Sequence, residues 1–191
     1  MRTFVLYSRK GITNPNFNNL VDAGRMDLVA RCISNALFLS RSLRNDRIIC
    51  VLNGPPKGPV SIEFNGYLKP ILPDEQSIGN LIKTALKCRI TNEWNEPFSG
   101  VKVAKKSFQN VIRELSSFPI YVLHEKGKII TDVNIEYDPV FVIGDNFGIP
   151  KNDESYALRF SKEKISLGGK NYLASQCITA INWICDLKGI F

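Results

Sequence analysis

The sequence predicts a single α/β domain over residues 1–191, with a mainly parallel sheet and helices on both of its faces. Three observations lead to this prediction. Short apolar runs typical of strands alternate with segments of helical periodicity, several of these runs end in glycine-containing loops, and no repeat, low-complexity segment or linker divides the chain. With 191 residues, 44% of them hydrophobic and 23% charged, the chain can bury one core and lacks the composition of disordered or collagen-like proteins.

The first half should contain three strands and a long helix. The strands are expected at residues 2–7, 48–52 and 60–64, and the helix runs on from Met26, where apolar residues recur at helical spacing. A polar loop over 11–19 precedes the helix, and Asn53-Gly54-Pro55-Pro56 ends the second strand. Because Asn65-Gly66 is a strong hairpin signal, residues 67–71 are expected to pair back onto the third strand.

The second half should alternate short helices and short strands. Helices are expected over 78–86, over 107–115 with Ser107 as N-cap, and over 172–186, while 91–100 should be a polar loop with Trp94 as a lid. Strands are expected at 119–123, 140–143, 157–160 and 165–167.

Cysteine, histidine and hydropathy patterns exclude several classes. The five cysteines form no CxxC pair and the chain has a single histidine, so we expect no metal site and mostly buried thiols. No apolar run approaches the roughly 18–20 residues needed to cross a bilayer, and the N-terminus reaches polar residues too early for a signal peptide. These features predict a cytoplasmic protein without a membrane segment.

The positive charge is concentrated at the front of the chain. The net charge is +7, and residues 1–60 hold nine Lys or Arg against three Asp or Glu, whereas residues 121–191 hold eight against nine. An excess of one sign on part of a protein favours a polyanionic partner such as nucleic acid, although it also serves solubility.

Three strand ends carry glycine or polar loops at which a ligand could bind. They are Leu123-His124-Glu125-Lys126-Gly127, Ile143 to Pro150 with Gly144 and Gly148, and Ile165 to Gly169. Ligands of open α/β sheets bind at the carboxyl ends of the strands, although each glycine alone is also ordinary turn chemistry. None of the loops matches GxGxxG or a GKS/GKT phosphate loop.

The order of these motifs along the chain resembles one family nearly end to end. VIGDNFGIP followed by ISLGGKNYLASQC, with AGRMDLVARC near the front and LNGPP after the second strand, is similar to the archaeal tRNA pseudouridine-54 N1-methyltransferases of the SPOUT superfamily. The resemblance implies a C-terminal deep trefoil knot, a homodimer formed through the C-terminal helix, S-adenosylmethionine (SAM) as methyl donor and tRNA as partner. Same-fold alternatives are a ribosomal RNA pseudouridine methyltransferase and a noncatalytic RNA-binding or ribosome-assembly factor.

The resemblance implies a cofactor pocket made from the loops of the knot. We expect apolar groups to enclose the adenine while backbone groups bind its edge. The apolar walls are Leu123, Gly144, Ile165, Leu167 and Leu173, and the remaining cofactor residues are Asp145, Gly148, Ser166 and Cys177. Cys177 is expected to be pocket wall or core rather than a nucleophile, because no partner base is visible near it.

The AGRMD segment supplies the candidate catalytic residues, Asp27 and Arg25. Methylation of N1 requires loss of its proton, so a positioned carboxylate such as Asp27 could accept that proton or stabilise a reactive tautomer. Arg25 and Arg31 could hold phosphate or an enol-like oxygen. The alternative is a charged first helical turn in which Asp27 complements the helix dipole and pairs with Arg31.

RNA binding should use the basic front end. Arg25, Arg31, Arg9 and Lys10 are the expected substrate-binding residues, and surface arginines elsewhere in residues 1–60 would contact phosphates. If the target base is extruded, Tyr7, Phe147 or Trp94 could stack on it, although each could equally be core or lid. The final helix carries Ile178, Ile181, Trp183, Ile184 and Cys185, which favours a dimer or a helix buried within a monomer.

Overall fold

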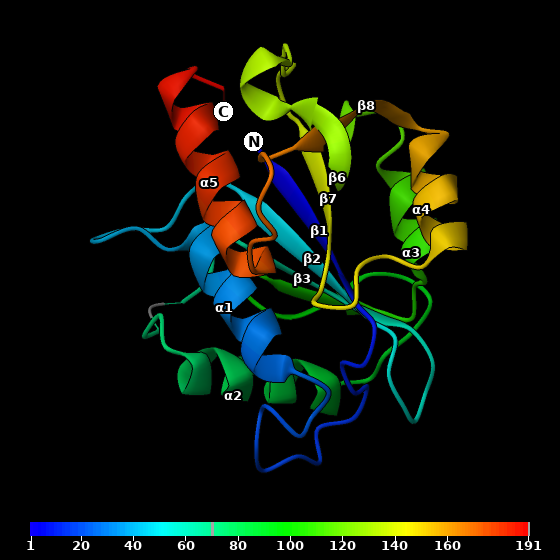
Figure 1. Cartoon of the computed structure of the whole chain (residues 1–191). Helices are drawn as coiled ribbons and strands as arrows, with labels where there is room; N and C mark the ends of the chain where they lie inside the picture. Colours follow the sequence, from blue (N-terminus) through cyan, green and yellow to red (C-terminus); the bar gives the residue numbers. More distant parts are fainter. Residues whose placement is uncertain (70, 191) are drawn as a thin grey trace.

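An eight-stranded sheet forms the centre of the computed structural model, which describes residues 1–69 and 71–190 (Figure 1). The strands in chain order are β1 (Thr3–Ser8), β2 (Arg47–Leu52), β3 (Val60–Asn65), β4 (Asn95–Phe98), β5 (Val101–Ala104), β6 (Ile120–Ile129), β7 (Val140–Gly144) and β8 (Ser161–Ser166). Their order across the sheet is β4-β5-β3-β2-β1-β7-β6-β8. β2, β1, β7, β6 and β8 pair in parallel, whereas β3, β4 and β5 extend the sheet in antiparallel fashion.

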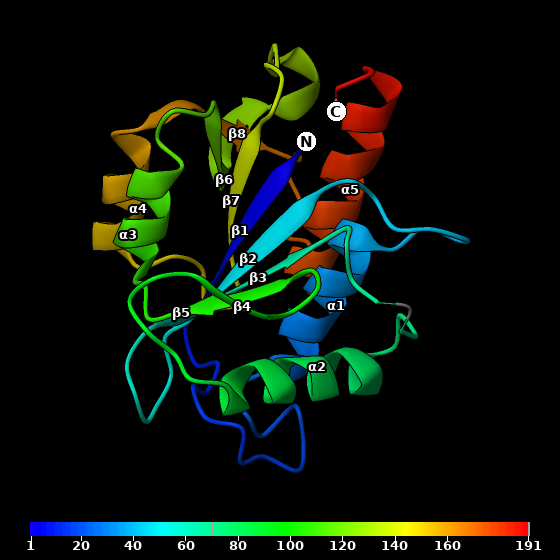
Figure 2. The same ribbon diagram turned by 180° about the vertical axis from the view of Figure 1, so that it is seen from behind.

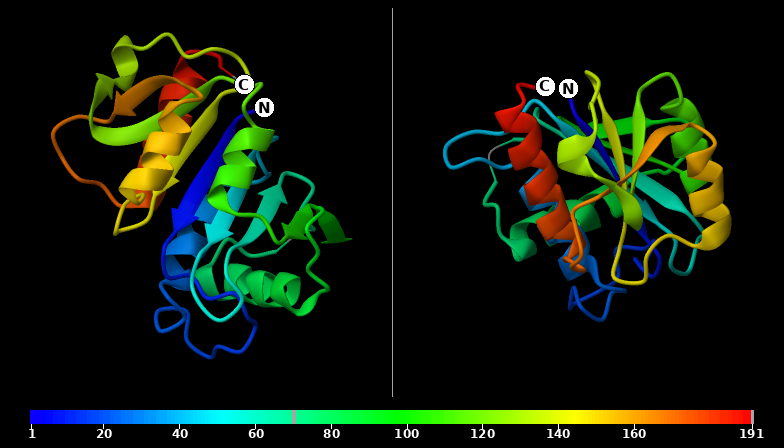
Figure 3. Two further views of the ribbon diagram at one scale, coloured as in Figure 1. Left: turned by 90° about the vertical axis from the view of Figure 1, so that its right-hand side faces the viewer. Right: turned by 45° about the horizontal axis from the view of Figure 1, so that its top comes forward.

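Helices cover both faces of this sheet, as predicted. They are α1 (Met26–Leu37), α2 (Glu75–Lys87), α3 (Phe108–Glu114), α4 (Lys151–Leu158) and α5 (Ala174–Leu187), with a short 3₁₀ helix over Ile130–Asp132. α1, α2 and α5 lie on one face, and α3 and α4 lie on the other (Figures 1 and 2). Figure 3 shows α5 and α4 on opposite sides of the sheet and the two chain termini close together. Each face therefore buries its own apolar cluster against the strands.

Local chemistry explains where the helices begin. The side chain of Asp74 accepts a hydrogen bond from the backbone N–H of Ser77 at 2.9 Å and caps α2. Ser107 caps α3 in a reciprocal capping box with Asn110, as its sequence position predicts. These caps satisfy backbone donors that the first helical turn leaves free.

β6 bulges outward where it passes the end of β8. Both Leu123 and Lys128 pair with Ile165, so the residues between them leave the ladder. A Cβ placed on Gly127 would lie 2.3 Å from the backbone carbonyl carbon of Ile165, which is closer than any side chain allows. Glycine at this position lets the two strands approach while residues 124–126 project away from the sheet.

Three local predictions are wrong. Asn65-Gly66 does not start a hairpin, because β3 pairs with β2 and β5; of the predicted returning strand 67–71, residue 70 lies outside the described residues. The predicted loop 91–100 contains β4, which pairs with β5, a strand that was not predicted. Residues 157–160 are not a strand, because α4 runs to Leu158 and is followed by a turn.

The other predicted elements, including β1, α1, α2, β7, β8 and α5, are confirmed with bounds that shift by a few residues. The strand predicted at 119–123 is also present, but β6 runs on to Ile129. The trefoil knot stays a prediction. All five cysteines are free thiols, and all but Cys88 are buried. In the described part of the chain, no helix has the length and apolar character needed to cross a membrane. The same residues hold no cluster of three or more His, Cys, Asp or Glu side chains suited to a metal ion.

Candidate active site

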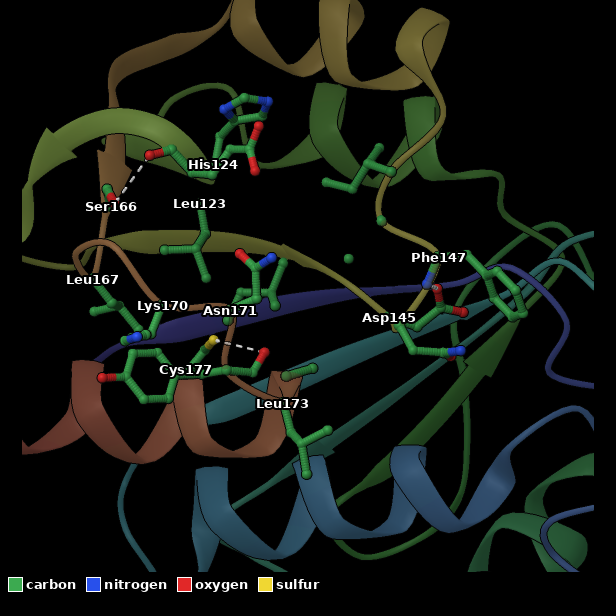
Figure 4. Close-up of a pocket in the computed structure, with 18 of the residues that line it drawn as sticks. Leu123, His124, Asp145, Phe147, Ser166, Leu167, Lys170, Asn171, Leu173 and Cys177 are labelled. Atoms are coloured by element: carbon green, nitrogen blue, oxygen red, sulfur yellow. Dashed lines mark hydrogen bonds between the residues drawn. The ribbon is translucent and has the colours of Figure 1, made fainter.

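A cavity of about 660 Å³ opens at the carboxyl ends of the parallel strands β7, β6 and β8 (Figure 4). Its walls come from the β6 bulge, the loop after β7, the loop after β8 and the first turn of α5, with Leu28 of α1 at one side. This volume falls in the range typical of small-molecule sites. Because β1 has β2 on one side and β7 on the other, the cavity also lies near the point where the strand order reverses, which is the usual ligand position in open α/β sheets.

The structure brings eight of the nine predicted cofactor residues into the lining of this one cavity. They are Leu123, Gly144, Asp145, Gly148, Ser166, Leu167, Leu173 and Cys177. The ninth, Ile165, is fully buried within β8 and packs in the core, so its side chain belongs to the wall behind the cavity. Other lining residues were missed by sequence reasoning. Lys170 and Asn171 directly follow Gly168-Gly169, which is a usable signal, whereas Glu154 in α4 stands beside no recognisable motif.

The lining is more acidic than the rest of the chain. Glu125, Asp145 and Glu154 contribute carboxylates, and Lys170 contributes the only lysine or arginine charge among the described lining residues. Glu154 lies 3.2 Å from the ammonium of Lys164 and 3.6 Å from Nε2 of His124, yet its Oε1 is buried without a hydrogen-bond partner among the described residues. In a chain with a net charge of +7, this cavity therefore suits a small ligand that carries positive charge.

Close backbone contacts shape the loop after β7. A Cβ on Gly144 would lie 2.7 Å from the backbone of Gly148 and 2.8 Å from the backbone nitrogen of Ile149. The loop thus folds back tightly onto the end of its own strand. This places backbone groups of residues 144–149 at the cavity surface, as a main-chain ligand site requires.

Asp145 lies at the side of the cavity that faces the basic residues of the first loop. Its Oδ2 accepts a hydrogen bond from the backbone N–H of Arg9 at 2.6 Å, and its Oδ1 accepts one from Phe147 at 2.9 Å. Burial raises the pKa of this carboxyl, and the nearby charges of Arg9 and Lys10 partly oppose the shift. Asp145 therefore links the cavity to the exposed chain around Arg9 and Lys10.

Asp27 is held by two arginines. Nε and Nη2 of Arg25 donate to its two carboxylate oxygens at 2.9 and 3.0 Å, and Nη2 of Arg31 donates to Oδ2 at 2.8 Å. Asp27 is 5% exposed, and the hydrogen bonds from Arg25 are the main reason that its pKa is lowered. The predicted pairing of Asp27 with Arg31 is thus confirmed, and Arg25 joins it in a three-residue cluster.

Arg25 has an unusual backbone conformation for a residue with a side chain. It is the N-cap of α1 and has a φ of 68°, in the left-handed region. Non-glycine residues rarely adopt this conformation, and such residues concentrate at functional sites. The contacts to Asp27 leave the N–H groups of Nη1 for another acceptor. The hydrogen bonds to Asp27 are also the main reason that the pKa of Arg25 is raised.

Cys177 has the surroundings of a wall residue. Its thiol is buried and donates a long hydrogen bond of 3.9 Å to the backbone carbonyl of Tyr172 (Figure 4). Burial raises its pKa to about 11. Since the thiolate is the nucleophilic form, Cys177 is unsuited to covalent catalysis near neutral pH.

Of the three aromatic residues considered for base stacking, only Phe147 lines the cavity. Its ring is 45% exposed, and the ammonium of Lys10 lies 4.5 Å from the ring centroid. Tyr7 is buried edge-on against Phe108, and Trp94 packs on the same apolar cluster while its Nε1 donates to Glu114. Tyr7 and Trp94 are therefore structural.

Comparison with families and curated proteins gives matches over the full chain. The model of a family described as "Putative SAM-dependent RNA methyltransferase" matches residues 1–190. The tRNA (pseudouridine(54)-N(1))-methyltransferase of Methanocaldococcus jannaschii is 38% identical, with 100% of this chain and 98% of the relative covered. The protein of the same name from Methanocella arvoryzae is also 38% identical and is covered over 100% of its length.

Solved structures with low sequence identity share the fold. Archaeoglobus fulgidus Nep1, bound to S-adenosylhomocysteine, matches with a TM-score of 0.62 at 15% identity over 98% of this chain and 99% of that one. The SpoU methyltransferase AviRb from Streptomyces viridochromogenes, in complex with AdoMet, matches with a TM-score of 0.50 at 10% identity over 97% of this chain and 57% of that one. At these identities the matches show the shared fold and no more.

Proposed function

The chain belongs to the family of SAM-dependent RNA methyltransferases, and we propose that it transfers a methyl group from SAM to N1 of pseudouridine 54 in the T-arm of tRNA. The observation that carries the proposal is the 38% identity over the whole chain to relatives that bear this activity in their names. The cavity at the strand ends supports it, because its lining combines an acidic character with backbone groups and apolar side chains.

The residues of the cavity fit SAM. Leu123, Leu167 and Leu173 offer apolar surface for an adenine ring, and the tight loop after Gly144 presents backbone groups to its polar edge. The carboxylates of Glu125 and Glu154 suit a ligand with a sulfonium and an ammonium group. When bound, SAM supplies an electrophilic methyl carbon on its sulfonium sulfur.

The protein's own contribution is to orient the base, exclude water and receive the N1 proton. Positioning two reactants can supply several kcal/mol of rate acceleration. The target base has to leave the folded RNA arm to reach the cavity, and the exposed ring of Phe147 offers a surface on which an extruded base can stack.

For Asp27 and Arg25 we propose a division of roles. The prediction that Asp27 accepts the N1 proton stays a prediction, and its contacts argue against it because three guanidinium N–H groups already bind its oxygens. A carboxylate whose pKa is lowered is a weak base. We propose that Asp27 positions Arg25, whose Nη1 then binds a carbonyl or phosphate oxygen of the RNA.

The RNA surface proposed here is the side of the molecule around Arg9, Lys10, Arg25 and Arg31. Arg9 and Lys10 are exposed, and the side chains of Arg25 and Arg31 are more than one-third exposed. Arg2 does not belong to it, because its buried guanidinium pairs with Asp46 and Asp186. Phosphate contacts from these side chains would orient the RNA without selecting its sequence.

We further propose a cytoplasmic homodimer formed through α5. Ile178, Ile181, Ile184 and Cys185 are buried within the chain's own core, so four of the five residues behind this prediction are already used. Trp183 and Leu187 on the same helix are 62% and 68% exposed, and Trp183 borders a second cavity between α1 and α5. Exposed Trp and Leu side chains on one helix suit an interface between copies.

The decisive experiment is a methyl-transfer assay on two otherwise identical tRNAs, one with pseudouridine and one with uridine at position 54. We expect SAM-dependent methylation of the pseudouridine tRNA alone, because C5-linked pseudouridine has a free N1. Ribosomal RNA fragments with pseudouridine form a third arm. Methylation of these fragments but not of tRNA would show that the substrate is ribosomal RNA. Binding of SAM without methylation of any RNA would favour a noncatalytic assembly factor.

A further inference from the structure

Two buried carboxylates lie near the junction between the cavity and the basic first loop, and their surroundings differ. Both oxygens of Asp27 are bound by guanidinium groups. Asp145 accepts one backbone N–H on each oxygen and forms no ion pair with any described residue. Each carboxylate oxygen has two acceptor positions, so one on each oxygen of Asp145 is left for a further donor.

Asp145 also differs from Glu154, another acidic residue of the cavity, in the residues that lie next to it. Glu154 lies 3.2 Å from the ammonium of Lys164 and near His124. Figure 4 shows His124 across the cavity from Asp145. Nδ1 of His124 accepts a hydrogen bond from the backbone N–H of Lys126 at 3.0 Å, so this nitrogen has no lone pair free for a substrate proton. Asp145 instead adjoins Phe147, the ring proposed to carry the extruded base.

We propose that the carboxylate of Asp145 accepts the N1 proton of the target pseudouridine. This inference rests on the proposed function and deepens it. The N1–H bond breaks and its proton passes to a free acceptor position on Asp145 and then to water. The electron pair of N1 forms the bond to the methyl carbon, and the pair of the broken carbon–sulfur bond stays on sulfur, giving S-adenosylhomocysteine.

The electrostatic environment agrees with this assignment. Burial raises the pKa of Asp145, whereas the guanidinium of Arg25 lowers that of Asp27. Two carboxyls whose surroundings shift their pKa values in opposite directions are a common arrangement of acid–base groups in enzymes. The more basic of the two is the one that lines the cavity and has free acceptor positions.

The test compares Asp145→Asn with Asp27→Asn in single-turnover methylation of pseudouridine tRNA, with Asp132→Asn, remote from the cavity, as the control. Asp145→Asn should lose about 10²- to 10⁴-fold in rate, which is the usual contribution of a general base. Its affinity for SAM, measured by calorimetry without RNA, should change less than about threefold if the loss is in proton transfer rather than binding. Asp27→Asn should lose less, and Asp132→Asn should match the wild type.

A second measurement uses only the wild type, so it tests the inference even if the Asp145→Asn protein does not fold. In the wild type, kcat/KM for the pseudouridine tRNA should rise with pH as Asp145 of the free enzyme loses its proton, and it should stay level above that pH. Carbon-13 NMR titration of the free protein should place the carboxyl pKa of Asp145 above the ordinary aspartate value and at the midpoint of this rise.

The two proposals fail in different ways. A wild type that methylates no RNA overturns the proposed function and this inference with it. A wild type that methylates, together with a folded Asp145→Asn variant within tenfold of its rate, overturns the inference alone. The inference alone is also overturned if the midpoint of the rise in kcat/KM differs from the pKa of Asp145 measured by NMR.

Discussion

Gly144 offers the sharpest test of where the cofactor binds. Replacing it by alanine puts a Cβ 2.7 Å from the backbone of Gly148 and 2.8 Å from that of Ile149, and neither backbone can turn away as a flexible side chain could. The strain is relieved by moving the loop over residues 144–149, which lines the cavity. Overpacking of this kind costs about 1–3 kcal/mol. If this cost destabilises the loop conformation that binds SAM relative to a displaced one, Gly144→Ala should weaken SAM binding roughly 5- to 150-fold.

Calorimetric titration with SAM and with S-adenosylhomocysteine measures this effect. Gly66→Ala is the matched control, because its Cβ would lie 2.4 Å from the carbonyl oxygen of Arg44 but far from the lining residues. It should lower the melting temperature and leave the affinity for SAM unchanged. Wild-type affinity in a folded Gly144→Ala protein would refute the assignment of this cavity to the cofactor.

Four further results are expected. Asp27→Asn should destabilise the fold by about 1 kcal/mol at pH 7, since its arginine partners are partly exposed; because the folded pKa of Asp27 lies below the unfolded one, urea melts should show this difference above about pH 4 and lose it at lower pH. Arg2→Met should cost about 3–5 kcal/mol by the same melts, because it leaves Asp46 buried without its cation, and a loss under 1 kcal/mol would contradict this. Alkylation of Cys177 should be slow at pH 8, rise towards pH 11 and be slowed by SAM, as mass spectrometry can follow; rapid labelling at pH 7 would exclude a buried thiol. Trp183→Glu should shift a dimer to monomer in light scattering, and an unchanged mass would exclude an interface at that residue.

Hydrophobic periodicity correctly predicted the elements whose apolar residues follow one clear helical or strand spacing. α2 buries one face, α1 is buried on most sides, and Ser107 caps α3 where its sequence position predicts. The wrong predictions concern features that the local sequence does not determine, such as which strands pair and where a helix ends. Asn65-Gly66 permits a hairpin, but both edges of β3 are already paired. One edge pairs with β2, which precedes β3 by a short loop, and the other pairs with β5, which follows α2. Residues 157–160 form a short mixed run, and such a run fits a helix end as well as a strand.

The part of the site that is formed by backbone loops could be predicted, because such loops need glycine at recognisable positions in the sequence. Glycines after strands pointed to the loops that line the cavity, and family resemblance ordered them. No pattern could show that Ile165 faces the core instead, since strand alternation within a three-residue run is ambiguous. Nor could spacing show that Arg25 binds both oxygens of Asp27, because that contact depends on the left-handed backbone at Arg25.

The measurement that bears most directly on the proposed function is nucleoside mass spectrometry of tRNA and ribosomal RNA from cells with and without the gene. Loss of the gene should remove N1-methylpseudouridine from position 54 of tRNA, leave pseudouridine in its place and spare ribosomal RNA. Unchanged methylation at position 54 in the deletion strain, or loss of a methyl group from ribosomal RNA alone, would contradict the assignment.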